Sequence, residues 1–219
     1  NLLMSFDTND SLNITDYSGY RNAGTVQNSA VWTSSGKIGG AYNFSNNPNA
    51  RISLTAAGSL RPISAMTVEA YVNSEKGICS VAVSTSDIVA KVSAAVGLDT
   101  FRLTVNSTCF VRFALWNSSS GSTVIDSTTV LSANRWYHIA GVFNGTYMKL
   151  YIDGVEEDNA SFPYTIGDNN IAVYIGDNSE DSSGGNFNGT IDEVRLYNVS
   201  LSTEEIVQHN NTNFNKIVA

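Results

Sequence analysis

The chain has 219 residues, a length compatible with one large β domain or two small ones. Only 15% of the residues are charged, so Ser, Thr, Asn and Gly must cover much of the surface. The formal net charge of −8 disfavours nucleic acid and anionic membranes as partners, and no apolar run approaches the ~18 residues of a membrane span.

Alternating apolar residues predict a series of β-strands separated by turns, a pattern typical of a sandwich or barrel. In chain order the predicted strands are residues 66–73, 101–105, 110–115, 136–143, 147–152, 171–176 and 190–197. Asn144-Gly145 and Asp153-Gly154 predict tight turns on the two sides of the strand 147–152. Residues 74–100 show no clear register, and we expect them to decorate one end of the fold.

One short helix is predicted near the C-terminus, over about residues 203–209. Ser202 and Glu205 have the capping-box spacing, in which each side chain accepts a hydrogen bond from the backbone of the other residue. Leu201 and Ile206 are spaced to pack against each other across this cap. The tail, residues 210–219, is polar until its last residues, which we expect to add an edge strand.

Two features indicate an extracellular protein. The first is a possible disulfide between the two cysteines, Cys79 and Cys109. It would close a loop of about 30 residues and contribute roughly 3 kcal/mol to stability, with free thiols as the alternative.

The chain begins as a strand and not as a signal peptide, so we expect its N-terminus to be a processing boundary.

The second feature is the glycosylation pattern Asn-x-Ser/Thr, which occurs ten times. The 25 asparagines and 46 serines plus threonines predict about five occurrences by chance (25 × 46/219). The excess indicates a glycoprotein, with compositional chance as the alternative. The candidate acceptors are Asn9, Asn13, Asn106, Asn117, Asn144, Asn159, Asn188, Asn198 and Asn210, and the tenth match, Asn43, is expected to lie in a strand.

The order of motifs along the chain resembles the laminin G-like, or concanavalin A-like, jelly-roll domains of secreted and cell-surface proteins. The resemblance covers about residues 3–209 and implies a single domain, residues 1–219, with two antiparallel sheets of six or seven strands packed face to face. The segments that carry it are MSFDTNDS, ITDYSGYRNAG, GKIGGAYNFSN, MTVEAYVN, NRWYHIAGVFNGTYMKLYIDGV, YIGD and NFNGTIDEVRLYNVSLSTEEI.

The resemblance also implies a structural calcium ion, because family members often use an acid at the start of the last long strand to bind one. The matching residues are Asp192, Asp7 and Asn46, the last in the loop 45–50. Calcium takes about six to eight oxygen ligands from carboxylates, amides and carbonyls. The alternative is that Asp192 only caps a turn, and in either case we expect Glu193 to point to the opposite face and to be exposed.

Candidates for ligand binding are weaker. Trp116 ends a strand before a Ser-rich turn, and Tyr164 lies in a loop, so both are candidates to stack on sugar rings. Asp177 and Asp181 belong to an acidic loop, residues 176–186, whose spacing favours a solvated loop over a second calcium site.

Other conspicuous residues favour structural roles. Trp32 and Trp136 are expected to pack in the core, and Asp16 is expected to hydrogen-bond the backbone of its own turn. His138 and His209 are not spaced as a metal pair. The acids of residues 156–158 are contiguous and do not alternate along one strand face, as a sugar-cleaving pair of carboxylates would.

These observations favour an extracellular, non-catalytic binding or adhesion module whose partner is carbohydrate or a surface glycoconjugate. The ligand class comes from the resemblance. Other copies of the chain or a larger surface protein are further possible partners, whereas nucleic acid and direct membrane insertion are not expected. The alternative is a structural subunit of a cell-surface layer, filament or pilus-like assembly that pairs its tail with a neighbour by strand addition. An enzyme is the least favoured hypothesis.

Overall fold

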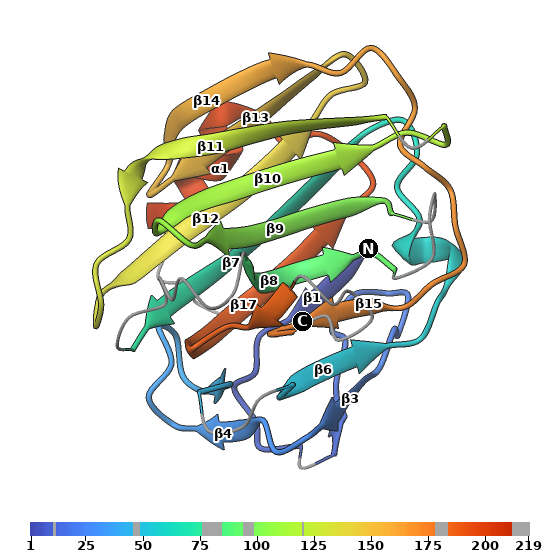
Figure 1. Ribbon diagram of the computed structural model, residues 1–219. Helices are drawn as coiled ribbons and strands as arrows, with labels where there is room; N and C mark the ends of the chain where they lie inside the picture. Colours follow the sequence, from blue (N-terminus) through green and yellow to red (C-terminus); the bar gives the residue numbers. More distant parts are fainter. Residues whose placement is uncertain are drawn as a thin grey trace.

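Two β-sheets pack face to face in the computed structural model of the protein (Figure 1). Sheet A has eight strands and sheet B has nine, and their pairing is antiparallel except where β16 runs parallel to β8. The jelly-roll sandwich predicted from the sequence is therefore confirmed, with additional short strands in both sheets. The structure describes residues 1–10, 12–45, 49–75, 85–93, 99–119, 121–177 and 184–211.

The strand order in the two sheets brings distant parts of the chain together. Sheet A has the order β14 (Val155–Ser161), β13 (Tyr147–Ile152), β12 (Trp136–Phe143), β7 (Met66–Ser74), β17 (Gly189–Tyr197), β5 (Ala41–Asn43) and β4 (Val31–Thr33), with β1 (Leu2–Met4) also paired to β17. Sheet B has the order β11 (Ser122–Val130), β10 (Phe110–Trp116), β9 (Phe101–Asn106), β8 (Thr85–Lys91), β15 (Val173–Ile175), β6 (Arg51–Leu54), β3 (Gly24–Gln27) and β2 (Asn13–Ile14), with β16 (Gly184–Asn186) beside β8.

The alternation of apolar residues decides which strand face enters the core. Val68, Ala70 and Val72 of β7 are fully buried in a cluster to which sheet B contributes Leu103 and Phe113. Burial of each such side chain contributes about 1.5–3 kcal/mol to stability. The strands predicted at 66–73, 101–105 and 110–115 are confirmed as β7, β9 and β10.

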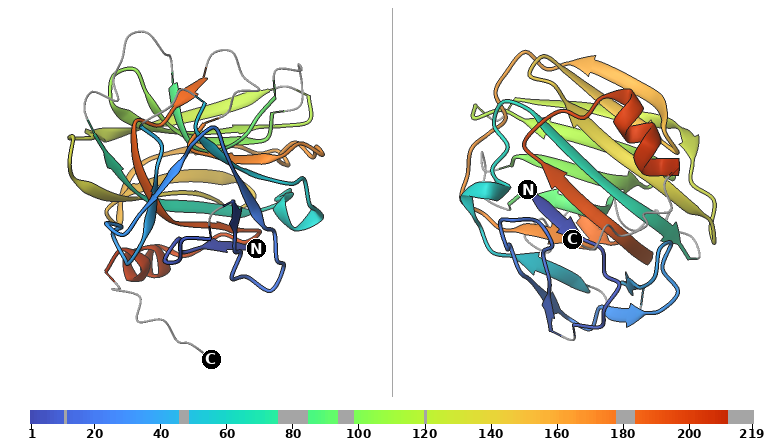
Figure 2. Two further views of the ribbon diagram at one scale, coloured as in Figure 1. Left: turned by 90° about the horizontal axis from the view of Figure 1, so that it is seen from below. Right: turned by 180° about the vertical axis from the view of Figure 1, so that it is seen from behind.

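The outer face of sheet A is covered by the C-terminal helix α1 (Thr203–Asn211), which lies across β12 and β13 in the rear view of Figure 2. The predicted capping box is present: Ser202 N donates to Glu205 Oε2 (2.7 Å) and Glu205 N donates to Ser202 Oγ (3.2 Å). Ile206 is fully buried, and Leu201 packs against the same cluster. The cap fixes where the helix starts, and its apolar face fixes how it docks.

The segment expected to decorate one end of the sandwich contains an interior strand. Residues 85–91 form β8, which pairs with β9 and β15 in sheet B and is buried along its whole length. The expectation was wrong here because a strand buried on both faces loses the alternation that identifies a half-buried one. Residues 76–84 and 94–98 lie outside the described part of the chain.

Both predicted tight turns are present. Asp153 and Gly154 have φ values of 50° and 80°, the left-handed pair that a type I′ hairpin turn requires. Gly145 has a φ of 96° in the turn that joins β12 to β13. The strand expected at 171–176 is shorter than predicted, spanning Val173–Ile175.

Side chains join the two sheets along one edge, where β11 of sheet B lies beside β14 of sheet A. Glu157 of β14 accepts hydrogen bonds from the backbone N–H groups of Thr128 (2.9 Å) and Thr129 (3.0 Å). Asp158 accepts a third bond, from Asp126 N, at 3.3 Å. The contiguous acids therefore cover a strand edge whose N–H groups would otherwise be available for pairing.

Other expectations concern edges and aromatic residues. Trp32 packs on the core and donates from Nε1 to Phe6 O (2.8 Å), whereas Trp136 is only partly buried and pairs with Asn73 on the outer side of sheet A. The opposite edge strands, β4 and β2, have three and two residues, too short to offer a long pairing edge. The expected tail strand lies outside the described residues. None of the described helices is long and apolar enough to cross a membrane.

Lys91 of β8 gives a stability prediction. Its side chain is fully buried and donates to Leu60 O (3.1 Å), and burial lowers the pKa of the ammonium group to about 8. The unfolded chain binds this proton more tightly, so the charged lysine costs stability below pH 8, and the cost fades between pH 8 and about 10.5. Lys91→Met should therefore raise the free energy of unfolding at pH 7 by about 1–2 kcal/mol, because the lost bond to Leu60 O offsets part of the gain.

Urea denaturation of both proteins from pH 6 to pH 10.5 would measure this difference. The advantage of the methionine variant should shrink as the pH rises above 8. An advantage that stays constant across that range would contradict a lysine with a lowered pKa.

Candidate functional site

Asp192 is fully buried on the outer side of β17, at a β-bulge. Its Oδ2 accepts a hydrogen bond from Ile38 N (3.0 Å), and its Oδ1 accepts one from Glu193 N (2.7 Å). Glu193 has a φ of 51°, the left-handed conformation that lets the bulge turn the chain. The residue that the sequence singled out is therefore held rigidly by backbone groups from two segments.

The loop of residues 36–40 brings Asp192 and Asp7 to the same place. Gly36 N donates to Gly39 O (3.0 Å), which closes the loop into a tight turn. A Cβ atom at Gly36 would lie 2.9 Å from Oδ2 of Asp192, and one at Gly39 would overlap with Oδ1 of Asp7. Gly39 also has a φ of 67°. Only glycine fits at these two positions, since the backbone of Gly40 and the Asp192 carboxylate fill the space at Gly36 and the Asp7 carboxylate fills it at Gly39.

This arrangement has the electrostatics of a cation site. The pKa of Asp192 is raised to about 8, mainly by burial and also by the negative charges of Glu193 and Asp7, although the two backbone hydrogen bonds act to lower it. Asp7 and Asp192 together supply carboxylate oxygens, and loop 36–40 places backbone groups beside them. This donor set suits calcium. Within the described ranges no group of three or more His, Cys, Asp or Glu side chains is arranged to hold a metal, so carbonyl or amide oxygens would have to complete the shell.

Sequence reasoning named Asp7 and Asp192 together with Asn46 of the loop 45–50, and it did not name loop 36–40. Asn46 lies outside the described residues, so its part in the site stays a prediction, whereas loop 36–40 contacts both acids. The three glycines of the segment GKIGG indicate a tight turn but not which carboxylates it contacts. The expectation that Glu193 is exposed was wrong, because Glu193 is only 4% exposed and forms an ion pair with Arg195.

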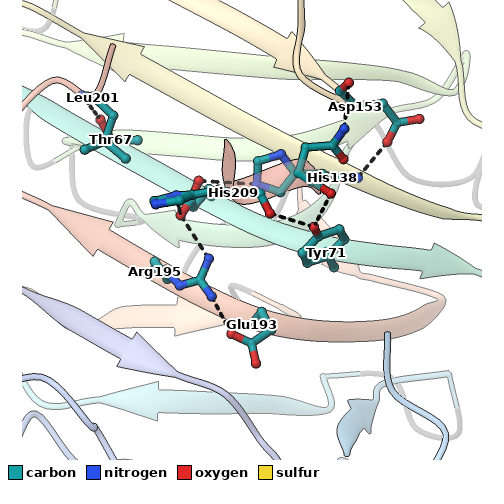
Figure 3. Close-up of polar contacts among 10 residues, drawn as sticks. Thr67, Tyr71, His138, Asp153, Glu193, Arg195, Leu201 and His209 are labelled. Carbon is teal, nitrogen blue, oxygen red and sulfur yellow. Dashed lines mark hydrogen bonds and ion pairs between the residues drawn. The ribbon is translucent and has the colours of Figure 1, made fainter. Parts of the chain in front are cut away.

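A second buried polar group, which we call the Glu69 cluster, lies between sheet A and the end of α1 (Figure 3). It consists of Glu69, His138, His209, Arg195 and Glu193. The carboxylate oxygens of Glu69 lie 2.7 Å from His209 Nδ1, 3.2 Å from Arg195 Nη1 and 3.3 Å from His138 Nε2. Arg195 Nη2 also contacts Glu193 at 2.5 Å. The two histidines, far apart in the sequence, thus share one carboxylate.

The Glu69 cluster holds the helix in place. Burial alone would raise the pKa of Glu69, but hydrogen bonds from His138 and His209 and the charge of Arg195 outweigh it and lower that pKa. Tyr71 donates to the carbonyls of His209 (2.9 Å) and Asn210 (3.0 Å), which satisfies acceptors at the end of the helix. The side chains of Glu69, His138, Glu193 and Arg195 are at most 4% exposed and that of His209 is 20% exposed, so the cluster anchors the end of α1 on sheet A.

The predicted ligand-binding residues lie in different parts of the molecule. Trp116 is half-buried at the end of β10, and Tyr164 is 55% exposed with its ring edge-on to Phe162. Asp177 is only 2% exposed and lies 3.9 Å from Arg51. Asp177 is therefore not part of a solvated acidic surface. Asp181 lies outside the described residues.

Trp116 belongs to the outer face of sheet B. Val111, Phe113 and Leu115 of β10 face the core, which places Arg112 and Trp116 on the opposite side. Arg112 forms a bidentate ion pair with Asp126 of β11, with distances of 2.7 and 2.8 Å. At β10 and β11 this face combines a partly exposed indole with charged hydrogen-bonding groups, and neither of the two described helices lies over these two strands (Figure 1).

Asp16 has the structural role expected of it. Its Oδ1 accepts bonds from Leu3 N (3.0 Å) and Ser18 N (2.8 Å), and its Oδ2 accepts one from Asn22 N (2.7 Å). The partner expected for Cys109, Cys79, lies outside the described residues, so the disulfide stays a prediction.

Comparisons with known proteins agree with this fold. A family model described as the concanavalin A-like lectin/glucanases superfamily matches residues 44–207. Among curated proteins nothing matches. Many solved structures are similar, although all those described below share less than 25% sequence identity with the chain.

Three of these structures illustrate the range. The binding domain of Paraclostridial mosquitocidal protein 1 has a TM-score of 0.75 and 17% identity, over 98% of this chain and 52% of its own. Domain 4 of AbnA, an extracellular arabinanase of Geobacillus stearothermophilus solved with arabinotriose, has a TM-score of 0.71 and 22% identity, over 94% of this chain and 96% of its own. The botulinum neurotoxin serotype D ligand-binding domain, solved with N-acetylneuraminic acid, has a TM-score of 0.68 and 16% identity, over 95% of this chain and 50% of its own. The chain thus spans about half of each toxin domain.

The Glu69 cluster predicts a large effect of a small change. Glu69→Gln keeps the shape of the side chain but removes the charge that Arg195 and both histidines face, so it should lower the free energy of unfolding by about 3–5 kcal/mol. Glu156→Gln is the matched control, because it removes the exposed ion pair with Lys149 (2.8 Å) and should cost at most about 1 kcal/mol. Guanidinium denaturation at pH 7 measures both, and equal losses would refute the anchoring role of Glu69.

Proposed function

The chain belongs to the concanavalin A-like lectin/glucanase superfamily, and we propose that it is an extracellular, non-catalytic module that binds carbohydrate. The main support is the end-to-end match with domain 4 of the arabinanase, a structure solved with a bound arabinose oligosaccharide. The toxin binding domains, one of them solved with N-acetylneuraminic acid, extend this support. Fold likeness alone does not fix a ligand, so the site has to supply the chemistry.

The outer side of β10 and β11 in sheet B is the surface that suits a sugar. The half-buried indole of Trp116 offers an aromatic face to the C–H groups of a sugar ring. Arg112 has five N–H donors and uses two of them on Asp126, and the Asp126 carboxylate is a strong acceptor, so the pair presents both kinds of group to hydroxyls. In sheet A, by contrast, α1 packs on the outer side of β12 and β13.

The described acids do not favour catalysis as the function. Asp192 and Asp7 lie under a tight loop, Glu69 is buried in its cluster, and Glu157 is committed to the backbone of β11. Asp192, Glu69 and Glu157 each accept hydrogen bonds or ion pairs that hold neighbouring segments in place. The arrangement therefore suits a binding module better than a glycosidase, which needs two carboxylates on opposite sides of a cleft.

A glycan array tests this function. Wild-type protein should bind a limited set of oligosaccharides, and Trp116→Ala should weaken that binding at least about tenfold, equivalent to about 1.4 kcal/mol. Trp136→Ala is the matched control, since this tryptophan lies on the outer side of the other sheet, and it should leave binding unchanged. Absence of wild-type binding to any glycan would refute the sugar-binding function. Equal binding by the two variants would refute only the placement of the sugar site at Trp116.

A structural calcium ion held by Asp7 and Asp192, with Asn46 as a further ligand, is part of the proposal. Without a cation, the raised pKa of Asp192 means that the folded state binds a proton that the unfolded state releases. Stability in a chelator should therefore fall as the pH rises from about 4 to 8.

Calcium should remove this fall by replacing the proton. At pH 7.5, calcium at a hundred times its dissociation constant should add about 2.7 kcal/mol, seen as a rise in melting temperature. Asp192→Asn should abolish both the calcium response and the pH-dependent fall. A wild-type melting temperature that is the same in calcium and in chelator would refute the ion, without affecting the sugar-binding proposal.

A further inference from the structure

The ten Asn-x-Ser/Thr patterns are not equivalent once the chain is folded. N-glycosylation attaches a bulky saccharide to the side-chain nitrogen Nδ2 of asparagine, so that nitrogen must be accessible and the surface beside it must be open. Several of the candidates fail this requirement. Nδ2 of Asn43, Asn198 and Asn210 donates to Glu75 Oε1 (2.5 Å), Ser59 O (3.3 Å) and Asp153 O (2.9 Å), respectively. Nδ2 of Asn159 also donates, to Glu156 Oε1 (3.0 Å), but Asn159 is exposed and is therefore not among the excluded positions.

Asn106 fails for a different reason. It is only 8% exposed, and its Oδ1 accepts bonds from Thr108 N (3.0 Å) and Phe110 N (3.1 Å) inside the turn between β9 and β10. A saccharide on this side chain would have to displace the turn. The same reasoning applies to Asn210, whose bond to Asp153 O fastens α1 to the hairpin turn.

Asn144 meets every requirement. It lies in the turn between β12 and β13, and all four residues 144–147 are exposed. Its Oδ1 accepts hydrogen bonds from Thr146 N (3.0 Å) and Tyr147 N (2.9 Å), the geometry of an Asx turn. These bonds use the carbonyl oxygen only. Among the described residues the Nδ2 atom has no hydrogen-bond partner, and it is left facing the solvent side of the turn.

The Asx turn also favours the chemistry. Two N–H groups on the amide oxygen polarise the amide and make its N–H protons more acidic, which assists the loss of a proton from Nδ2 during the transfer. In the transfer, Nδ2 forms a bond to the anomeric carbon of a lipid-phosphate-linked saccharide. The bond from that carbon to the phosphate oxygen breaks, the lipid phosphate leaves with the electron pair, and Nδ2 loses one proton to a base of the transferase.

Asn117 is an internal comparison for this argument. Its Oδ1 accepts the same kind of bonds, from Ser119 N (2.8 Å) and Gly121 N (3.0 Å). However, Asn117 is half-buried, and its Nδ2 lies 2.8 Å from where a Cβ of Gly121 would be. It has the turn chemistry of Asn144 without the open surroundings. Asn13 is the opposite case, exposed but without the Asx turn.

We propose that Asn144 is the principal N-glycan acceptor of this chain, and that Asn43, Asn106, Asn198 and Asn210 are not glycosylated in the folded protein. This modification site is independent of the sugar that the module binds. It places a covalent saccharide at the tip of the β12–β13 hairpin, a part of the molecule away from the Arg112–Asp126 pair in sequence and in sheet.

Site-resolved mass spectrometry tests the proposal on the 219-residue chain secreted from a eukaryotic host. Enzymatic glycan release in ¹⁸O water converts each occupied asparagine to labelled aspartate. We expect label at Asn144 in most molecules, less at Asn117, and none at the four excluded positions. No label at Asn144 in the secreted, folded protein, or substantial label at Asn106 or Asn210, would overturn the proposal.

Asn144→Asp is the matched variant, because its carboxylate can accept the same two backbone hydrogen bonds but has no nitrogen to modify. It should lose one glycan mass and keep the melting temperature of unglycosylated wild-type protein from a host that lacks the transferase. Thr146→Val, which removes the exposed hydroxyl of the acceptor pattern, should lose the same mass. An unchanged glycan mass in both variants would refute Asn144 as the acceptor.

Discussion

The outward side of β17 carries charge that the protein has to bury, because Asp192, Glu193 and Arg195 are each at most 4% exposed. Removing such groups from water is costly unless each finds a partner. Loop 36–40 supplies backbone donors to Asp192, and Glu69 supplies a negative charge to Arg195. The β-bulge at residues 192–195 makes this possible, since it turns two consecutive acids into the same buried layer.

The coverings of this strand determine the rest of the architecture. Loop 36–40 contacts Asp192 and Asp7 at one part of β17, and His209 of α1 contacts Glu69 beside Arg195 at another. Strand β17 is thereby committed to internal contacts on both faces. In sheet B the strands β8 and β9 are also buried on both faces, whereas β10 and β11 keep partly exposed residues on their outer side. The outer side of β10 and β11 is therefore the part of this sheet that remains for the proposed ligand.

Much of the fold could be predicted from the sequence because the signals were local. Alternation placed β7, β9, β10, β12 and β13, the glycine turns placed the hairpins, and the capping box placed the start of α1. Strand β8 was missed because complete burial removes the alternation, and β14 was missed because its exposed edge carries polar and acidic residues. Both errors come from the position of a strand in the sheet, which local sequence does not encode.

The candidate sites show the same limit at longer range. Asp7 and Asp192 could be paired only through the family resemblance, and the contribution of loop 36–40 was not predicted because its glycines do not indicate which carboxylates they accommodate. Nothing in the sequence indicates that His138 and His209 meet on Glu69, since that contact depends on how α1 crosses the sheet. Asp177 looked like a solvated loop acid, yet its ion pair with Arg51 requires knowledge of β6.

The carboxylates of β14 that cover β11 have a consequence for colloidal behaviour. Backbone ladders protect a sheet edge at any pH, whereas this edge is protected by Glu157 and Asp158, whose acceptor strength depends on ionisation. The hydrogen bonds from Thr128 and Thr129 lower the pKa of Glu157 despite its partial burial. The contact between Glu157 and the edge of β11 therefore persists into mildly acidic conditions. In stronger acid, when these carboxylates are protonated, the N–H groups of β11 become available for pairing with a strand of another molecule. The solubility of this protein is therefore set in part by two side chains at a seam and not only by its net charge.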